Sequence, residues 1–272
     1  MAARSTGTSR SRARTSRSRA RTSRALSQNF LADHAAARRF ARLATPDPTP
    51  LLLEVGAGGG ALTAPLARRA PDLVAYEIDG RLAARLRERF AGQAHVRVRH
   101  ADFLAVRPPR EPFAVAGNVP FSRTADVVDW CLRADALTRA VLLTQLEYAR
   151  KRTGDYGSWT RRTVLTWPHF EWRLLGRVPR TAFRPAPRVD AGVLRIERRA
   201  TPLLTPAEYP AYERLVTLGF SGVGGSLRAS LNRAHPRRRV DAALREAGIP
   251  PGALVGQAAP DQWLRLWAVL YR

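Results

Sequence analysis

The chain has 272 residues, 46 of them basic and 22 acidic, so its formal net charge is +24. A chain of this length can bury a full hydrophobic core and suits one large domain with a smaller one. The basic excess predicts a polyanionic partner. Nucleic acid is favoured over a membrane because the apolar runs are too short to span a bilayer. Lys151 is the only lysine, and this preference for arginine is typical of a GC-rich genome rather than of function.

Residues 1–25 form a low-complexity segment in which SRSRART is repeated and in which no acidic or aromatic residue occurs. Such a composition cannot bury enough apolar surface to offset the entropy of ordering, so it predicts disorder. We interpret the segment as an arginine-rich arm directed at RNA, and low-complexity drift without function is the alternative. A transit peptide fits less well, because alanine is nearly the only apolar residue available for an amphipathic face.

Cys131 is the only cysteine, and it falls within a predicted amphipathic helix. A single cysteine forms neither an internal disulfide nor a thiolate metal site. The five histidines also lack the spacing of metal ligands. We therefore expect no metal site, a buried and reduced cysteine, and a monomeric cytoplasmic protein.

From Leu51 onward, short apolar runs alternate with amphipathic stretches, which is typical of a parallel α/β sheet. The apolar runs predict seven strands, at 51–56, 73–78, 95–100, 113–117, 140–145, 169–178 and 189–199. Helices are predicted between them at 60–70, 80–91 and 123–134. After Thr201 the pattern becomes helical, near 206–219, 237–247 and 260–271. We therefore expect one domain over residues 26–200 and a second, helical domain over 201–272.

A glycine-rich stretch, EVGAGGGALT (54–63), joins the first predicted strand to a helix. Gly56, Gly58 and Gly60 allow a tight turn and let a ligand approach without a Cβ in the way. With Ala61, the spacing fits the dinucleotide fingerprint, and Glu77 follows about twenty residues later, where it can accept from two ribose hydroxyls. The pattern indicates an adenosine-containing cofactor and does not distinguish NAD from S-adenosylmethionine.

Two further strand ends favour the methyl donor. Asp102 follows the third strand, where its carboxylate can accept from an adenine amino group, with Phe103 as an apolar neighbour. A simple helix cap is the alternative for Asp102. The fourth strand ends in Asn118, Val119, Pro120 and Phe121, a motif that has no role in hydride transfer.

The motif at 118–121 suits a planar base that carries an amino group. The Asn118 side-chain oxygen and a backbone carbonyl beside Pro120 can accept from the amino hydrogens, and Pro120 stiffens the turn that aims this carbonyl. Phe121 can stack on the base, a contact worth about 1–3 kcal/mol. The base must leave its own stack to be reached.

In this order the motifs resemble those of the rRNA adenine-N6 methyltransferases, and among these the erythromycin-resistance type that modifies 23S rRNA. The resemblance covers about residues 26–199 and rests on LSQNFL (26–31), EVGAGGGALT (54–63), YEID (76–79), ADFL (101–104), NVPF (118–121), LLTQLEYARKRTG (142–154) and FRPAPRVDAGVL (183–194). SQNFL, NVPF and TVLTWPHFEW (163–172) favour the resistance type. The small-subunit (16S) rRNA adenine dimethyltransferases, which act in ribosome biogenesis, are the alternative within the family.

The resemblance implies a Rossmann-like, seven-stranded S-adenosylmethionine-dependent methyltransferase sheet with a small helical C-terminal domain. It implies methyl transfer from S-adenosylmethionine to N6 of one adenine in the peptidyl-transferase region of 23S rRNA, naked or before assembly. Macrolide-lincosamide-streptogramin resistance would follow. Residues 26–200 would be the catalytic domain and 201–272 an RNA-binding domain. Rival readings are a non-catalytic RNA-binding factor that has kept the fold and an NAD oxidoreductase.

The resemblance also assigns site residues. Gln28, Asn29 and Leu31 would close over the methionine end of the cofactor, which Gly56 would face. Glu77 would take the ribose, Asp102 the adenine, and Asn118 either the methionine amino group or the target. The full set of expected cofactor-binding residues is Gln28, Asn29, Leu31, Gly56, Gly58, Glu77, Ile78, Asp102, Phe103 and Asn118. The expected catalytic residues are Asn118, Pro120 and Phe121.

Basic loops and the last helix complete the expectations. YARKRTG (148–154) and RTAFRPAPR (180–188) are expected to lie near the mouth of the site, and we favour RNA contacts for both over simple solvation. For the basic stretch AHPRRR (234–239), RNA contact and simple solvation are equally compatible with the sequence. Trp263 and Trp267 are four residues apart on a helix, which favours core packing over a base platform.

Overall fold

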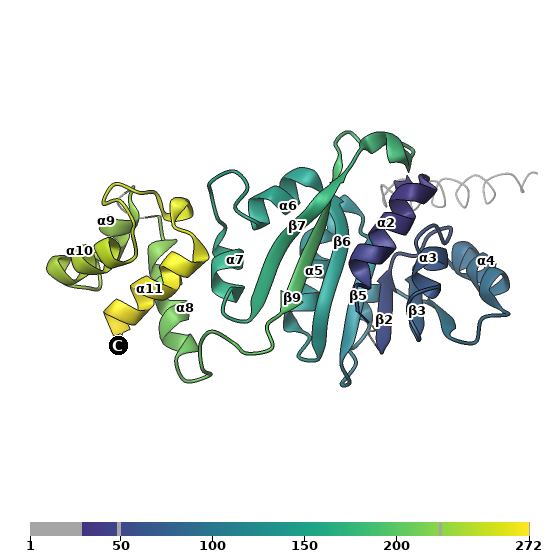
Figure 1. Cartoon of the computed structure of the whole chain (residues 1–272), viewed down its shortest axis with the longest axis horizontal. Coiled ribbons are helices and arrows are strands. Elements are labelled where there is room, and N and C mark those ends of the chain that lie inside the picture. Colours follow the sequence, from purple (N-terminus) through teal and green to yellow (C-terminus); the bar gives the residue numbers. More distant parts are fainter. Residues whose placement is uncertain (1–28, 48–49, 223–224, 272) are drawn as a thin grey trace, which may run out of the picture.

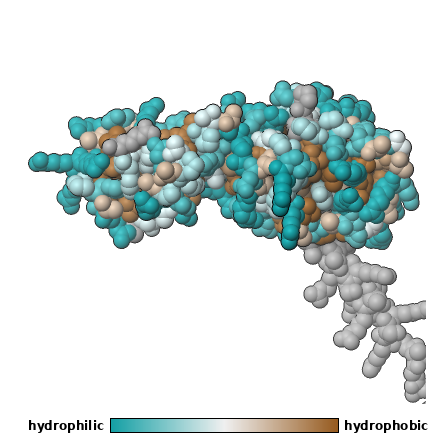
Figure 2. Space-filling model, turned by 90° about the horizontal axis from the view of Figure 1, so that it is seen from below, coloured by the Kyte–Doolittle hydropathy of each residue, from teal (hydrophilic) through white to brown (hydrophobic). Residues whose placement is uncertain are grey.

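The computed structural model describes residues 29–47, 50–222 and 225–271. The segment 1–25 and Gln28 lie outside these residues. Figure 1 shows a central sheet flanked by helices and, beside it, a cluster of helices that includes the C-terminus. Seen from below, these parts form two lobes joined by a narrower waist, and their surface is mostly hydrophilic with apolar residues showing between (Figure 2).

All seven predicted strands form, and they pair into one sheet in the order β4-β3-β2-β5-β6-β9-β7. The strands are β2 (Leu51–Val55), β3 (Leu73–Glu77), β4 (Val96–His100), β5 (Phe113–Asn118), β6 (Leu137–Gln145), β7 (Phe170–Val178) and β9 (Ala191–Arg198). The first five are mutually parallel, whereas β9 runs antiparallel to both β6 and β7. The chain order reverses between β2 and β5, and such a switch point opens a ligand crevice at the carboxyl ends of the strands.

Helices cover both faces of this sheet because each helix has one apolar side (Figure 1). The helices of this part are α2 (His34–Ala44), α3 (Thr63–Ala67), α4 (Gly80–Phe90), α5 (Thr124–Arg133), α6 (Leu146–Arg152) and α7 (Arg161–Thr166). One core contains Phe40 of α2, Leu66 of α3 and Leu86 of α4, and the other contains Val128 and Cys131 of α5. Burial raises the pKa of the Cys131 thiol, so this cysteine is an inert core residue, as predicted.

A short ribbon that the sequence did not predict connects the start of the described chain to the loop after β7. The two-residue strands β1 (Phe30–Leu31) and β8 (Phe183–Arg184) pair antiparallel. The backbone N–H groups of Ala32 and Asp33 also donate to the Ala182 carbonyl, at 2.7 and 3.1 Å. Residues 29–31 are thereby held at the carboxyl edge of the sheet.

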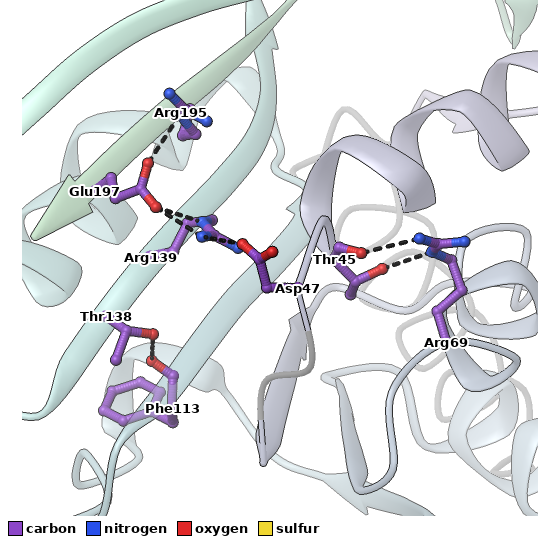
Figure 3. A network of polar contacts seen from close by, with 8 residues as sticks. All are labelled: Thr45, Asp47, Arg69, Phe113, Thr138, Arg139, Arg195 and Glu197. Atoms are coloured by element: carbon purple, nitrogen blue, oxygen red, sulfur yellow. Dashed lines mark hydrogen bonds and ion pairs between the residues drawn. The ribbon is translucent and has the colours of Figure 1, made fainter.

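The end of α2 is anchored by two arginines at the opposite edge of the sheet (Figure 3). Arg69 donates to the Thr45 hydroxyl at 2.8 Å and to the Thr45 carbonyl at 3.0 Å. Arg139 on β6 donates to Glu197 on β9 at 2.9 and 2.6 Å and to Asp47 at 3.4 Å. These contacts fix α2 at its carboxyl end, while β1 fixes the segment before it.

The helical cluster contains α8 (Tyr209–Gly219), α9 (Leu227–Leu231), α10 (Arg237–Glu246) and α11 (Pro260–Tyr271). Its core surrounds Trp263 and Trp267, so the predicted core role of both is confirmed. Val164 of α7 belongs to the same core, and the Tyr212 hydroxyl donates to its carbonyl at 2.8 Å. The C-terminal core therefore includes a residue of α7, a helix that precedes residue 200 in the chain. The helical pattern after Thr201 did not indicate this contact.

Candidate active site

Three adjoining pockets lie at the carboxyl ends of β2, β3, β4 and β5. The first pocket is bounded by the glycine loop and α2, the second by Glu77 and residues 118–121, and the third by residues 101–104. The first and second share Phe30, Gly56, Gly58 and Asn118, and the second and third share Gly56, Ile78 and Pro120. They therefore form one continuous trough at the switch point of the sheet.

The glycine loop forms the wall of this trough, and its conformation requires glycine. Gly56, Gly58 and Gly60 have φ values of 67, 56 and 81°, a region that other residues rarely adopt. A Cβ at Gly58 would lie 2.9 Å from the ring of Phe30, which covers the loop. Glycine is therefore needed at Gly58 for the turn and for the close packing of the Phe30 ring.

Glu77 lies at the end of β3, buried to 2% exposure, beside the second pocket. One carboxylate oxygen accepts from the Gly58 N–H at 2.7 Å, and the other accepts from the Asp79 N–H at 2.8 Å. Each oxygen keeps a further lone pair. The carboxylate is thus rigidly held by the glycine loop and by the start of α4, with acceptor capacity left for a ligand.

Asp102 and Phe103 both line the third pocket, and each also has a structural role. The Asp102 carboxylate accepts from the Leu104 N–H at 3.0 Å and caps a 3₁₀ turn, Phe103–Ala105, so the capping alternative is realised in the fold. The Phe103 ring is buried and packs against Tyr76 and Trp130, at centroid distances of 5.6 and 4.4 Å. Ile78, by contrast, is exposed and lines both the second and third pockets.

Asn118 is oriented by the N-terminal segment. Its side-chain N–H donates to the Asn29 backbone carbonyl at 2.7 Å, across 89 residues of sequence. A carbonyl only accepts, so the amide nitrogen must face Asn29 and the amide oxygen is left as an acceptor beside the second pocket. Asn29 and Phe30 line this pocket, whereas Leu31 lies in the core at 5% exposure and borders the first.

Beside the Asn118 side-chain oxygen, the turn after Asn118 leaves one backbone carbonyl near Pro120 as a candidate second acceptor. The Pro120 carbonyl already accepts from the Arg123 N–H at 2.8 Å. The other carbonyl beside Pro120 is that of Val119, whose side chain is buried and whose N–H donates to the Leu143 carbonyl at 3.2 Å. Phe121 is half-buried, borders the second pocket and touches the core only in part.

Glu54 is the functional candidate that sequence reasoning missed. It lies within β2 at 1% exposure, and neither carboxylate oxygen makes a hydrogen bond of normal geometry among the described residues, although the Thr63 hydroxyl lies close by. Burial raises the pKa of the Glu54 carboxyl to about 8, although the Thr63 hydroxyl acts in the opposite direction, and the nearby Glu77 charge adds a smaller increase. Its side chain borders the first pocket. The available signal was an acid inside an otherwise apolar strand, LLLEV, immediately before the glycine loop.

The first pocket combines this buried acid with basic residues at its rim. His34 and Arg38 of α2, Arg68 after α3 and Arg89 of α4 border it, and all four are exposed. Arg89 also donates to the Gly59 carbonyl at 2.9 Å. An acid at the floor with cations at the rim suits a ligand that carries both an ammonium and a carboxylate, as an amino acid does.

Basic loops border the same edge of the sheet next to the trough. Gln145, the last residue of β6, pairs with Ala191 at the start of β9, and Val178 at the end of β7 pairs with the same residue. The segments 146–160 and 179–190 therefore both begin at this edge (Figure 1). Within the described ranges, no cluster of metal-ligating side chains and no helix able to cross a membrane is found.

Comparisons with known proteins identify the family. The family model for ribosomal RNA adenine dimethylase matches residues 19–271. An rRNA adenine N-6-methyltransferase of Streptomyces fradiae is 60% identical over 247 residues, which is 90% of this chain and 77% of that protein. Ribosomal RNA small subunit methyltransferase A of a Synechococcus strain is 33% identical over 251 residues, covering 88% of this chain and 89% of the relative.

The solved structures agree with the sequence relatives. The crystal structure of the 23S rRNA methyltransferase ErmE superposes with a TM-score of 0.87 at 50% identity, and the match covers 90% of this chain and all of that one. The predicted resemblance and the seven-stranded fold are confirmed. The chain belongs to the ribosomal RNA adenine dimethylase family and is an rRNA adenine-N6 methyltransferase.

Proposed function

We propose that this protein transfers methyl from S-adenosylmethionine to N6 of one adenine in the peptidyl-transferase region of 23S rRNA, which gives macrolide-lincosamide-streptogramin resistance. The observation that carries the choice of RNA is the full-length match to a 23S rRNA methyltransferase, at a TM-score of 0.87 and 50% identity. The small-subunit alternative has the weaker support of relatives at 33% identity.

The three pockets of the trough fit S-adenosylmethionine in one orientation. Its third pocket would hold the adenine, between Ile78 and Phe103 and within reach of the Asp102 carboxylate. Its second pocket would hold the ribose, whose hydroxyls would donate to Glu77. Its first pocket would hold the amino-acid end, and the orphaned Glu54 carboxyl is the group that this fit explains best. An ammonium would supply that carboxyl with the partner it lacks.

Asn118 and the Val119 carbonyl would act on the target amino group. The cofactor supplies a methyl group on a positively charged sulfur, and the adenine N6 lone pair is delocalised into its ring. Two acceptors aimed at the N6 hydrogens favour a pyramidal nitrogen and expose that lone pair. Because Asn29 holds the Asn118 amide nitrogen, the amide oxygen is preoriented for this role.

Phe121 would receive the extruded adenine. Its ring borders the second pocket directly after the two acceptors. Stacking on the base is worth about 1–3 kcal/mol, and the ring face also favours the positive charge near the reacting atoms. The chain needs no general base, because the methylated N6 is acidic enough to release its proton to water. The chain's contribution is alignment of the reacting atoms.

The remaining parts of the proposal concern the RNA and the setting. Residues 26–200 would form the catalytic domain and 201–272 an RNA-binding domain, with the arginines of 180–188 beside the trough. The substrate would be 23S rRNA that is naked or not yet assembled, and the enzyme would act as a monomer in the cytoplasm, where that RNA is made.

The test is methyl transfer from labelled S-adenosylmethionine to protein-free 23S and 16S rRNA, with the modified base mapped by primer extension. We expect label in 23S rRNA at one adenine. Label confined to 16S rRNA would replace the proposal with the small-subunit alternative.

A further inference from the structure

The loop between α6 and α7, residues 153–160, displays an aromatic ring that the core does not use. Tyr156 is 52% exposed, the largest exposure of any aromatic side chain in the part of the chain that the structure describes. A single exposed ring is common on protein surfaces, so its significance depends on its neighbours and its position. The ring belongs neither to the trough nor to any of the three cores.

The loop that carries Tyr156 has a defined conformation. The Asp155 N–H donates to the Arg150 carbonyl at 3.2 Å, and the Gly157 N–H donates to the Gly154 carbonyl at 2.9 Å. Gly154 has φ of 71°, and a Cβ there would lie 2.3 Å from the Trp159 ring. The loop therefore requires glycine at position 154, and its backbone hydrogen bonds fix the exposed position of Tyr156.

One arginine lies over the ring. The Arg150 guanidinium lies 5.0 Å from the centroid of the Tyr156 ring, and its Nε is fixed by an ion pair to Asp155 at 2.5 Å. A second pair, the Arg152 guanidinium 4.8 Å from the Tyr148 ring, is half-buried against the core on another side of α6 and does not belong to this exposed surface. An exposed aromatic ring beside a cation is a feature of surfaces that bind unpaired nucleic acid, because a base stacks on the ring while the cation contacts a phosphate.

The position of the loop links the ring to the reaction. Asn118 pairs with Leu143 on the neighbouring strand, and α6 begins three residues later, at the same edge of the sheet. The loop after α6 continues along this edge toward the C-terminal helices, where the Trp159 N–H donates to the Gly256 carbonyl at 2.6 Å (Figure 1). RNA that delivers an adenine to Asn118 and extends toward the C-terminal helices would pass the loop that carries Tyr156.

We propose that Tyr156 is a stacking platform for an unpaired nucleotide of the substrate RNA that flanks the target adenine, with Arg150 holding the ring in place. Extruding the adenine breaks its stacking with its neighbours, so a second ring that receives a neighbour offsets part of this loss. The inference rests on the proposed function, since it takes the substrate to be RNA that carries an extruded adenine.

The test uses the full chain and protein-free 23S rRNA. Tyr156→Ala should raise the KM for RNA about 5- to 150-fold, the range that corresponds to losing one stacked base. The kcat, the Kd for S-adenosylmethionine and the melting temperature should change little, because the ring touches neither the trough nor a core. Tyr156→Trp should restore the KM.

Salt dependence separates stacking from support of Arg150. A stacked base releases no counterion, so the slope of log KM against log salt should be the same for Tyr156→Ala and the wild type. A slope lower by about one would show that the ring only aims Arg150 at a phosphate, and would overturn the proposal. A KM within twofold of the wild type would also overturn it, while leaving methylation of 23S rRNA intact. Absence of wild-type methylation of 23S rRNA would instead remove the proposed function on which the inference rests.

Discussion

The two halves of the carboxyl edge of the sheet are built in different ways. The half over β2, β3 and β4 is defined by backbone, with glycines at positive φ and a buried Glu77 that is held by two N–H groups. The half over β6, β7 and β9 is defined by exposed arginine and tyrosine side chains on loops. A ligand of fixed shape suits the first half, whereas a flexible polyanion suits the second. Asn118, on β5, stands where the two halves meet.

The largest effect is expected at this meeting point. Asn118→Ala should lower kcat about 100- to 1000-fold, because its oxygen acts most strongly as the N6 nitrogen becomes pyramidal. The Kd for RNA and for S-adenosylmethionine should stay within a few-fold of the wild type. Single-turnover methyl transfer, measured beside binding of both ligands, checks this. A variant that loses RNA binding as strongly as turnover would mean that Asn118 belongs to the RNA half alone.

Methyl transfer should depend on an aromatic ring at position 121. Phe121→Ala should lose about 2–4 kcal/mol of transition-state stabilisation, since stacking and the cation–π contact are lost together. Phe121→Tyr and Phe121→Trp keep a ring and should stay active. Phe121 also touches the core in part, so the melting temperature must be measured with the activity. A Phe121→Ala protein that melts several degrees lower but methylates normally below its transition would make the ring structural.

Glu54 should give the cofactor half a distinctive pH dependence. The carboxyl has its ordinary pKa of 4.5 in the unfolded chain and about 8 in the folded protein. Between these values the unfolded chain loses the proton while the folded protein keeps it, so the free energy of unfolding falls as pH rises and then levels off near pH 8. Glu54→Gln cannot ionise and should be more stable than the wild type at pH 7 by on the order of 3 kcal/mol. At pH 4 the difference should vanish.

Urea unfolding at a series of pH values measures this effect, with Glu88→Gln as the control because Glu88 is exposed on α4. The same Glu54→Gln variant should bind S-adenosylmethionine more weakly, because the ammonium loses its buried partner. In the wild type, cofactor affinity should rise with pH toward 8, as Glu54 gives up its proton more easily. Equal pH profiles for Glu54→Gln and the wild type would show that Glu54 is not the buried acid described above.

Glu77 should have the smallest of these effects and should separate the halves most cleanly. Glu77→Ala should weaken S-adenosylmethionine binding by about 1–3 kcal/mol, the scale of lost charge-assisted hydrogen bonds. RNA binding should not change. Calorimetry with the cofactor and a gel-shift titration with RNA check both statements. Unchanged cofactor affinity in a folded variant would refute the ribose assignment.

The sequence predicted the positions of the strands and turns along the carboxyl edge better than the contacts that connect them. Strands, glycine loop, Glu77 and Asp102 follow local patterns, because each is set by residues near it in the chain. The contact between Asn29 and Asn118 joins residues 89 positions apart, and no local pattern indicates it. The ribbon of β1 and β8 has two residues in each strand, too few for a periodic signal.

Burial explains the other omissions. Glu54 lies in the glycine motif EVGAGGGALT. Its candidate role in ligand binding depends on its burial without a well-formed hydrogen bond, which only the fold reveals. Val164 joins the C-terminal core only through tertiary packing, so composition placed it with the first domain. In the fold Asp102 has the capping role that the sequence offered as the alternative to adenine binding, and the Phe103 ring packs in the core, which the sequence did not indicate.

A structure of the protein with S-adenosylhomocysteine bound is the most direct test of the proposal that the β2–β4 half of the carboxyl edge holds the cofactor and the other half holds RNA. The account predicts adenine in the third pocket near Asp102, ribose hydroxyls on Glu77 and the amino-acid end over Glu54. It also predicts that the side-chain oxygen of Asn118 remains free for the RNA. Adenine found in the first pocket, or a ligand that leaves Glu77 and Glu54 without contact, would contradict it.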